Sequence, residues 1–201
     1  WPSRSRTDGT AAATGRTGTE TVSTLDEQAR EKVRSMSPQQ RVGQLMMIGI
    51  QGTTVDQDAA YQIAQYHMGN VILFDRNMQS TQQVKDLNAA LARQIRRQSQ
   101  DIPPFIAVDQ EGGFVLRMRD AFPRVPSEQQ LGENGDPAAA RTWAVTTGKK
   151  LKELGFNLNF APVVDLGSAS ERSYSRDPAV VTSFARQAVE GYEEVKIWCA
   201  L

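Results

Sequence analysis

The 201-residue sequence has few of the residues that mark several common classes of protein. It contains one cysteine, Cys199, so no disulfide can form within the chain. It contains one histidine, His67, and no His/Cys cluster has the spacing of a metal site. No apolar run approaches the ~20 residues that span a bilayer. We therefore expect no metal centre, and the 23 basic and 23 acidic residues give no argument for nucleic acid as a partner.

Glycine-rich nucleotide-binding loops are also missing. The apolar run at 45–50 is followed by Gln51-Gly-Thr-Thr, which matches neither the G-x-G-x-x-G fingerprint nor a P-loop. No G-x-S-x-G motif, which presents a serine nucleophile in α/β-hydrolases, is present. We therefore expect no cofactor.

The first part of the chain lacks large apolar residues after Trp1. Residues 1–22 are rich in Thr, Gly, Ala, Arg and Ser, so they cannot bury enough surface to offset the entropy of ordering. They also lack the apolar region of a signal peptide. We expect a disordered lead or linker at 1–22 and a folded domain at 23–201. A flexible lead slightly favours an exported protein over a cytoplasmic one.

Apolar runs alternate with amphipathic segments along the rest of the chain. The runs predict five strands, at 45–50, 71–74, 105–108, 158–164 and 197–201. A weakly periodic helix is expected at 56–67, and other helices should start at capping residues: Thr24, Ser37, Ser80, Asp136 and Asp177. Continuous apolar strands separated by helices predict a parallel sheet covered by helices.

Two architectures fit this α/β pattern, an open doubly wound sheet and a (β/α)₈ TIM-type barrel. The missing glycine-rich loop favours the barrel. A complete barrel takes ~250 residues. We therefore expect only the first four βα units and the start of the fifth strand.

Polar residues follow the third predicted strand directly. Asp109 ends the apolar run, Glu111 lies two residues later, and Gly112-Gly113 predicts a tight turn or a close backbone approach. The carboxyl ends of parallel strands are where α/β folds bind their ligands. Asp109 therefore indicates a site for a polar small molecule, such as a sugar.

Further charged residues follow the fourth predicted strand. Asp165 ends it, and Arg172 and Arg176 come next. Carboxylates accept hydrogen bonds from sugar hydroxyls and arginines donate to sugar oxygens, so these groups can form a polar ligand site. The alternative is that they pair with one another and hold the loops together. The ligand interpretation is favoured more for Asp109 and Arg172 than for Glu111, Asp165 and Arg176.

Three other chemical interpretations were weighed. Asp109 and Asp165 are compatible with the acid and nucleophile of a glycosidase, although nothing in the pattern requires it. His67 follows a predicted helix, on the side opposite the ligand loops, and we expect a structural role for it. Cys199 lies in an apolar run and is expected to be a small core residue.

With these residues in view, the chain resembles the N-terminal catalytic domain of family 3 glycoside hydrolases, and most of all their β-N-acetylhexosaminidase branch. The β-glucosidase branch usually carries a Trp-Gly-Arg segment after the fourth strand, which is absent here. The resemblance covers about residues 36–198. It rests on four segments: Val71-Ile-Leu-Phe with Arg76-Asn77, Val108-Asp-Gln-Glu-Gly-Gly with Arg117, Leu154-Gly-Phe-Asn-Leu-Asn-Phe-Ala-Pro-Val-Val-Asp165, and Glu171-Arg-Ser-Tyr with Asp177-Pro178.

The resemblance implies a barrel that removes terminal β-linked N-acetylglucosamine with retention of configuration. Asp109, Arg117 and Arg172 match family positions that bind the sugar. The implied partner is a glycan that contains N-acetylglucosamine, such as a peptidoglycan fragment or a chitin oligomer. One departure is Phe114, where the family usually has arginine.

In the family, a Lys-His pair that binds the sugar opens a Lys-His-Phe-Pro-Gly-His-Gly motif directly after the fifth strand, and the general acid/base histidine and the nucleophilic aspartate come further along. This chain ends at Leu201, where that motif should begin. We therefore expect no catalytic residue in this chain and no activity of the chain alone. The alternatives are a non-catalytic sugar-binding half-barrel and a member of the β-glucosidase branch. We also expect low stability, or self-association through open barrel edges.

Overall fold

The computed structural model describes residues 24–167 and 171–201, and contacts divide the chain into two units, 1–35 and 36–201. The described part of the first unit is helix α1 (Leu25–Ser35). Its capping box is confirmed, because the Thr24 N–H donates to Glu27 Oε2 at 2.8 Å and Thr24 Oγ1 accepts from the Glu27 N–H at 3.2 Å. The lead predicted at 1–22 lies outside the described residues. No helix in the described ranges is long and apolar enough to cross a membrane.

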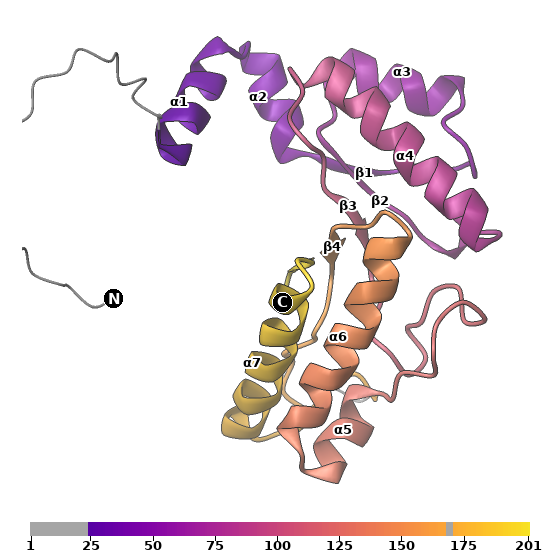
Figure 1. The fold of residues 1–201 in the computed structure, drawn as a ribbon, viewed down its shortest axis with the longest axis vertical. Coiled ribbons are helices and arrows are strands. Elements are labelled where there is room, and N and C mark those ends of the chain that lie inside the picture. Colours follow the sequence, from indigo (N-terminus) through magenta and orange to yellow (C-terminus); the bar gives the residue numbers. More distant parts are fainter. Residues whose placement is uncertain (1–23, 168–170) are drawn as a thin grey trace, which may run out of the picture. The chain divides into compact units, whose positions relative to one another are not determined.

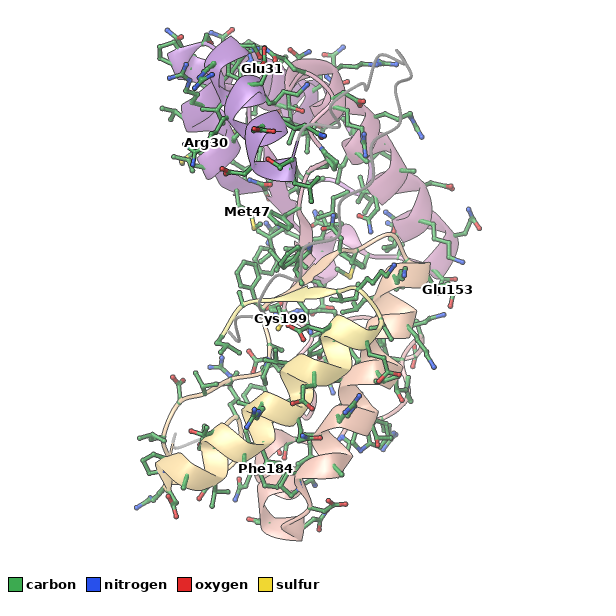
Figure 2. The ribbon with its side chains drawn as sticks, turned by 60° about the vertical axis from the view of Figure 1, so that its left-hand side comes forward. Arg30, Glu31, Met47, Glu153, Phe184 and Cys199 are labelled. Carbon is green, nitrogen blue, oxygen red and sulfur yellow. The ribbon has the colours of Figure 1, made fainter. Side chains whose placement is uncertain are left out.

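The second unit is built on a parallel sheet whose strands lie in the order β1-β2-β3-β4-β5. The strands are β1 (Met47–Gly49), β2 (Asn70–Ile72), β3 (Ile106–Val108), β4 (Leu158–Asn159) and β5 (Trp198–Cys199). Figure 2 labels Met47 and Cys199 on the two outer strands. Each strand pairs with its neighbour in sequence, whereas a doubly wound sheet reverses its order at a switch point. The order therefore excludes the doubly wound alternative and is that of successive units of a (β/α)₈ barrel.

Helices cover the sheet: α2 (Pro38–Leu45) precedes β1, and the others follow β1, β2, β3 and β4. These others are α3 (Gln57–Tyr66), α4 (Thr81–Gln98), α5 (Glu128–Asn134), α6 (Pro137–Glu153) and α7 (Pro178–Glu194). Figure 1 shows α6 and α7 running side by side, and these two helices share the most extensive contact between elements. The predicted helix starts at Ser37, Ser80, Asp136 and Asp177 are all N-caps.

The core lies between the sheet and these helices. Val71 and Val108 are fully buried with Leu91 of α4 and Phe184 of α7. The outer strand β5, in contrast, leaves 67% of Trp198 exposed.

Several features differ from the prediction. All five strands are shorter than the predicted apolar runs, and Leu45, predicted in the first strand, is the last residue of α2. The fourth strand ends at Asn159 instead of residue 164, and Pro162 has no N–H to extend the ladder. At α4, the Gln83 side chain accepts a hydrogen bond from the Gln79 N–H instead of from the N–H of the N-cap residue Ser80. Ser80 and Gln83 therefore do not complete a capping box. Two elements were not predicted at all: α5 and a 3₁₀ turn, η1 (Asp75–Asn77).

Candidate functional site

Asp109 and Arg117 form a paired hydrogen bond at the carboxyl end of β3. Arg117 Nε donates to Asp109 Oδ1 at 2.8 Å and Nη2 donates to Oδ2 at 2.6 Å. Arg117 Nη1 also donates to Asp75 Oδ2 of η1 at 2.8 Å. The hydrogen bond that Arg117 donates to Asp109 is the main reason that the pKa of Arg117 lies above its usual range. The carboxyl ends of β2 and β3 are thus joined by one guanidinium group, which is 22% exposed.

Arg172 and Glu111 form a second pair of this kind, and Glu111 lies two residues after Asp109 in the sequence. Arg172 Nε donates to Glu111 Oε2 at 2.7 Å, and Nη2 donates to Oε1 at 2.8 Å. The side chain of Glu111 is 7% exposed, whereas that of Arg172 is 41% exposed. The hydrogen bond to Glu111 raises the pKa of Arg172. This pair connects the loop after β3 to the loop after β4.

Two buried amides position these pairs, and sequence reasoning missed both. The Gln110 N–H donates to Asn159 Oδ1 at 2.8 Å, and Asn159 Nδ2 donates to the Gln110 carbonyl at 3.0 Å and to Tyr192 Oη at 3.0 Å. Gln110 Oε1 accepts from the Arg117 N–H at 2.8 Å. The residue between the two acids therefore fixes both the strand end and the start of the arginine loop. A glutamine flanked by acids at a strand end is a signal that could have indicated this.

The Gly112-Gly113 turn brings the backbone close to another segment, as predicted. The two glycines have φ values of +112° and +56°. A Cβ on Gly112 would lie 2.5 Å from the Pro126 carbonyl oxygen, and one on Gly113 would lie 2.7 Å from Ser127 Cβ. A side chain at either position would therefore be strained and crowded.

Phe114 follows this turn. Its N–H donates to Glu171 Oε1 at 3.0 Å and its carbonyl accepts from Arg119 Nη2 at 2.6 Å. Its side chain is about half exposed. Phe114 therefore places an aromatic ring at the edge of the loop.

Helix α5 starts next to these loops with a buried acid, Glu128, which is 4% exposed. Glu128 Oε1 accepts from the Val163 N–H at 2.7 Å. Burial is the main cause that raises the pKa of Glu128 to about 8. The N–H of the next residue, Gln129, donates to the Glu171 carbonyl at 3.1 Å. The first turn of α5 therefore contacts both parts of the loop after β4.

The other predicted residues lie apart from the two pairs. In the described ranges, no hydrogen bond or ion pair joins the side chain of Asp165 or Arg176 to either pair, although the Asp165 carbonyl accepts from Ser173 Oγ at 2.6 Å. His67 caps α3 in the left-handed conformation, at φ +52°, and its Nδ1 is buried with no hydrogen-bond partner among residues 24–167 and 171–201. Cys199 packs partly buried against the core, and burial raises the pKa of its thiol. No metal-binding group of three or more His, Cys, Asp or Glu occurs among the described residues.

Residues 38–201 match the family model described as the glycosyl hydrolase family 3 N-terminal domain. Among curated proteins, beta-hexosaminidase A of Pseudoalteromonas piscicida is 35% identical to this chain over 160 residues. The aligned region covers 74% of this chain and 27% of that protein.

Solved structures resemble the fold. The chain matches a family 3 beta-N-acetylglucosaminidase from Paenibacillus sp. with a TM-score of 0.77 and 34% identity, over 82% of this chain and 32% of that one. It matches NagZ from Neisseria gonorrhoeae in complex with N-trifluoroacetyl-D-glucosamine with a TM-score of 0.66 and 28% identity, over 75% and 46% of the two chains. This chain thus spans between about a quarter and a half of the length of these relatives.

Proposed function

Because the chain belongs to the glycosyl hydrolase 3 family, matching its N-terminal domain, we propose that it forms the sugar-binding half of a β-N-acetylhexosaminidase site. The whole enzyme would remove terminal β-linked N-acetylglucosamine with retention of configuration. The observation that carries the proposal is the two guanidinium–carboxylate pairs at the carboxyl ends of adjacent strands. Such groups recognise a polar, hydroxyl-rich ligand.

The three proposed sugar-binding residues have different roles. Arg172 uses Nε and Nη2 for Glu111, which leaves Nη1 to donate to a sugar oxygen. Asp109 accepts one bond on each oxygen from Arg117, and each oxygen keeps a second lone pair for a sugar hydroxyl. Arg117 uses all three nitrogens on Asp109 and Asp75, so its main role is to orient Asp109. Glu111 orients Arg172 in the same way.

We assign these residues to binding and not to bond cleavage. An arginine donates a hydrogen bond to each oxygen of Asp109 and to each oxygen of Glu111, and these charged partners make both carboxylates weaker nucleophiles toward a sugar carbon. This disfavours Asp109 as a glycosidase nucleophile paired with Asp165. The expected result is that the 201-residue chain binds N-acetylglucosamine but does not hydrolyse an aryl N-acetylglucosaminide.

Calorimetry with N-acetylglucosamine tests the proposal. We expect wild-type binding to weaken at least tenfold in Arg172→Ala, because loss of a hydrogen bond to a charged group costs about 1.5–3 kcal/mol. The matched control is Arg186→Ala, whose arginine is 79% exposed on α7. Turnover of the aryl substrate by the chain alone would contradict the assignment to binding. Absence of heat at millimolar sugar with a folded protein would contradict the proposal itself.

A non-catalytic sugar-binding half-barrel is a second candidate, favoured by the completeness of both pairs within the described residues. The two candidates predict different activities for the natural protein that contains these residues. Turnover by the longest natural chain that contains these residues supports the enzyme, and sugar binding without turnover by that chain supports the binding module. Binding of glucose in preference to N-acetylglucosamine would instead favour the β-glucosidase branch.

We also propose that the 201-residue chain self-associates. An apolar groove of about 780 Å³ lies along α7, and Val164, Leu166 and Leu201 are among its lining residues. Leu166 is 54% exposed and Leu201 is 70% exposed. Exposed apolar surface of this kind favours association with a second copy.

A further inference from the structure

The start of α5 contacts every loop that carries the proposed sugar site. Pro126, just before the helix, approaches Gly112 so closely that no Cβ fits between them. Gln129 donates to the Glu171 carbonyl, next to Arg172. Glu128 accepts from Val163, which follows β4. The three segments therefore meet at this short helix.

Glu128 lies at that meeting point with only one of its oxygens bonded. Oε1 accepts the Val163 N–H at 2.7 Å, whereas Oε2 is buried without a partner among the described residues. An ionised carboxylate in this place has lost its water and receives one hydrogen bond in exchange, which strongly disfavours the charge. A neutral carboxylic acid has much less to lose there.

The charged and titratable groups around Glu128 come from three parts of the structure. They are Glu111 from the loop after β3, Asp165, Arg172 and Tyr174 from the loop after β4, and Tyr192 from α7. Glu111 and Asp165 oppose a negative charge on Glu128, and Arg172 favours it. Arg172 is, however, already paired with Glu111 through two hydrogen bonds. Among the described residues, no positively charged group therefore hydrogen-bonds to Glu128.

We propose that Glu128 is a positioning residue of the sugar site, whose neutral carboxyl keeps the Val163 segment and the Glu111–Arg172 pair in place and whose ionisation disturbs both. This inference rests on the proposed function and adds a pH dependence to it. An ionised Glu128 repels Glu111 and competes with it for Arg172. It also draws water toward the buried, unpartnered Oε2, which competes with the packing of the Val163 segment. Either change displaces the Nη1 group that we assign to a sugar oxygen.

Sugar affinity as a function of pH tests the inference. Burial raises the pKa of Glu128 to about 8, so the proton is held at pH 7 and is largely lost at pH 9. One unit above the pKa about a tenth of the molecules keep the proton, so affinity for N-acetylglucosamine should fall about tenfold between pH 7 and pH 9. In Glu128→Gln, which stays neutral and keeps the acceptor for Val163, affinity should stay constant between pH 7 and pH 9. The matched control is Glu133→Gln, an exposed acid on the same helix, which should follow wild type.

A readout without sugar separates this inference from the proposed function. The side-chain carboxyl ¹³C signal of Glu128 should titrate with a midpoint near 8, and the Arg172 Nε–H signal should shift with the same midpoint in wild type but not in Glu128→Gln. A carboxyl midpoint below pH 6, or an Arg172 signal that does not follow it, overturns the inference. Parallel affinity profiles for wild type and Glu128→Gln overturn it as well. If the sugar does not bind at any pH, the proposed function fails, and the two NMR signals still decide the role of Glu128.

Discussion

At the scale of single residues, the two arginines differ in how many partners they hold. Arg117 donates both to Asp109 and to Asp75, and Asp75 lies 42 residues before Arg117 in the sequence. Among the described residues, Arg172 forms an ion pair only with Glu111. Arg117 is also the less exposed of the two, at 22% against 41%. Arg117 should therefore contribute more to stability, and Arg172 more to ligand recognition.

Replacement of each arginine by lysine should separate these contributions. Lysine keeps the charge but cannot form two parallel bonds to one carboxylate. We expect Arg117→Lys to lower the free energy of unfolding by about 1–3 kcal/mol, because hydrogen bonds of a part-buried charged pair are lost. Arg172→Lys should have a smaller effect on unfolding but a larger effect on sugar affinity. Urea unfolding measures the first quantity and calorimetry the second, and the opposite order in both would contradict the division of roles.

Glu128 should make stability depend on pH in an unusual direction for an acid. Its pKa in the folded protein is about 8, above the ordinary value of 4.5, so the folded state binds the proton more tightly than the unfolded state. Its contribution is fully present below pH 4.5 and is lost as the pH rises to about 8. The slope should be at most about 1.4 kcal/mol of unfolding free energy per pH unit.

Urea unfolding between pH 5 and 8, taken with Glu128→Gln, measures this slope. The variant should show a flatter profile than wild type, and Glu133→Gln should not. Equal slopes for wild type and Glu128→Gln would show that Glu128 is ionised in the folded protein.

At the scale of elements, helix starts were easier to predict than strand ends. A helix start depends on local chemistry, and the N-caps at Ser37, Asp136 and Asp177 form bonds within three residues. The end of β4 depends instead on which backbone groups of the neighbouring strands are placed to form hydrogen bonds with it. The sequence of the strand alone does not reveal that pairing. The paired bonds of the site have the same limit, because Glu111 and Arg172 lie 61 residues apart. Sequence reasoning identified the charged residues but not which acid binds which arginine.

Helix α5 is the element whose omission mattered most. It has seven residues, too few for a periodic apolar face to be recognised. Its capping box, formed by Ser127 and Gln130, was nevertheless present in the sequence. A search for Ser-x-x-Gln would have found its start, although not the burial of Glu128, which comes from tertiary packing.

Gly132 provides a test of how tightly α5 is held. In an isolated helix, alanine is favoured over glycine by about 1 kcal/mol. Here a Cβ at Gly132 would overlap the carbonyl oxygen of Tyr174, a backbone atom that cannot rotate away. We expect Gly132→Ala to destabilise the protein by about 1–3 kcal/mol, because overpacking outweighs propensity.

Thermal unfolding measures the effect of Gly132→Ala, with Asn134→Ala at an exposed position of the same helix as the control. A rise in melting temperature for Gly132→Ala would show that α5 separates easily from the Tyr174 segment. In that case α5 could not hold the site loops in place.

At the scale of the whole molecule, the alternation of apolar runs was sufficient to predict a parallel sheet. The choice of a barrel over a doubly wound sheet rested on a missing motif, and the strand order confirmed it. The β5 edge and the groove along α7 expose apolar side chains, among them Trp198 and Leu166. These are the surfaces through which we propose that copies of the chain associate.

Sedimentation at increasing concentration should detect self-association of the 201-residue chain. Leu166→Asp places a charge in the apolar groove along α7, so we expect it to weaken association at least tenfold. Tyr61→Asp, at a side chain that is 61% exposed on α3, is the control and should associate as wild type does. A wild-type chain that sediments as a compact, cooperatively melting monomer would contradict self-association.

The consecutive strand order has a consequence for how the protein is made. Among the described strands, each of β2 to β5 pairs with the strand synthesised immediately before it. The sheet can therefore grow one βα unit at a time as residues leave the ribosome. The ion pairs of the proposed sugar site form later, because Glu111 can pair with Arg172 only after the next 61 residues have been translated. Strands β1 to β3 can thus pair well before the negative charge of Glu111 is balanced by Arg172.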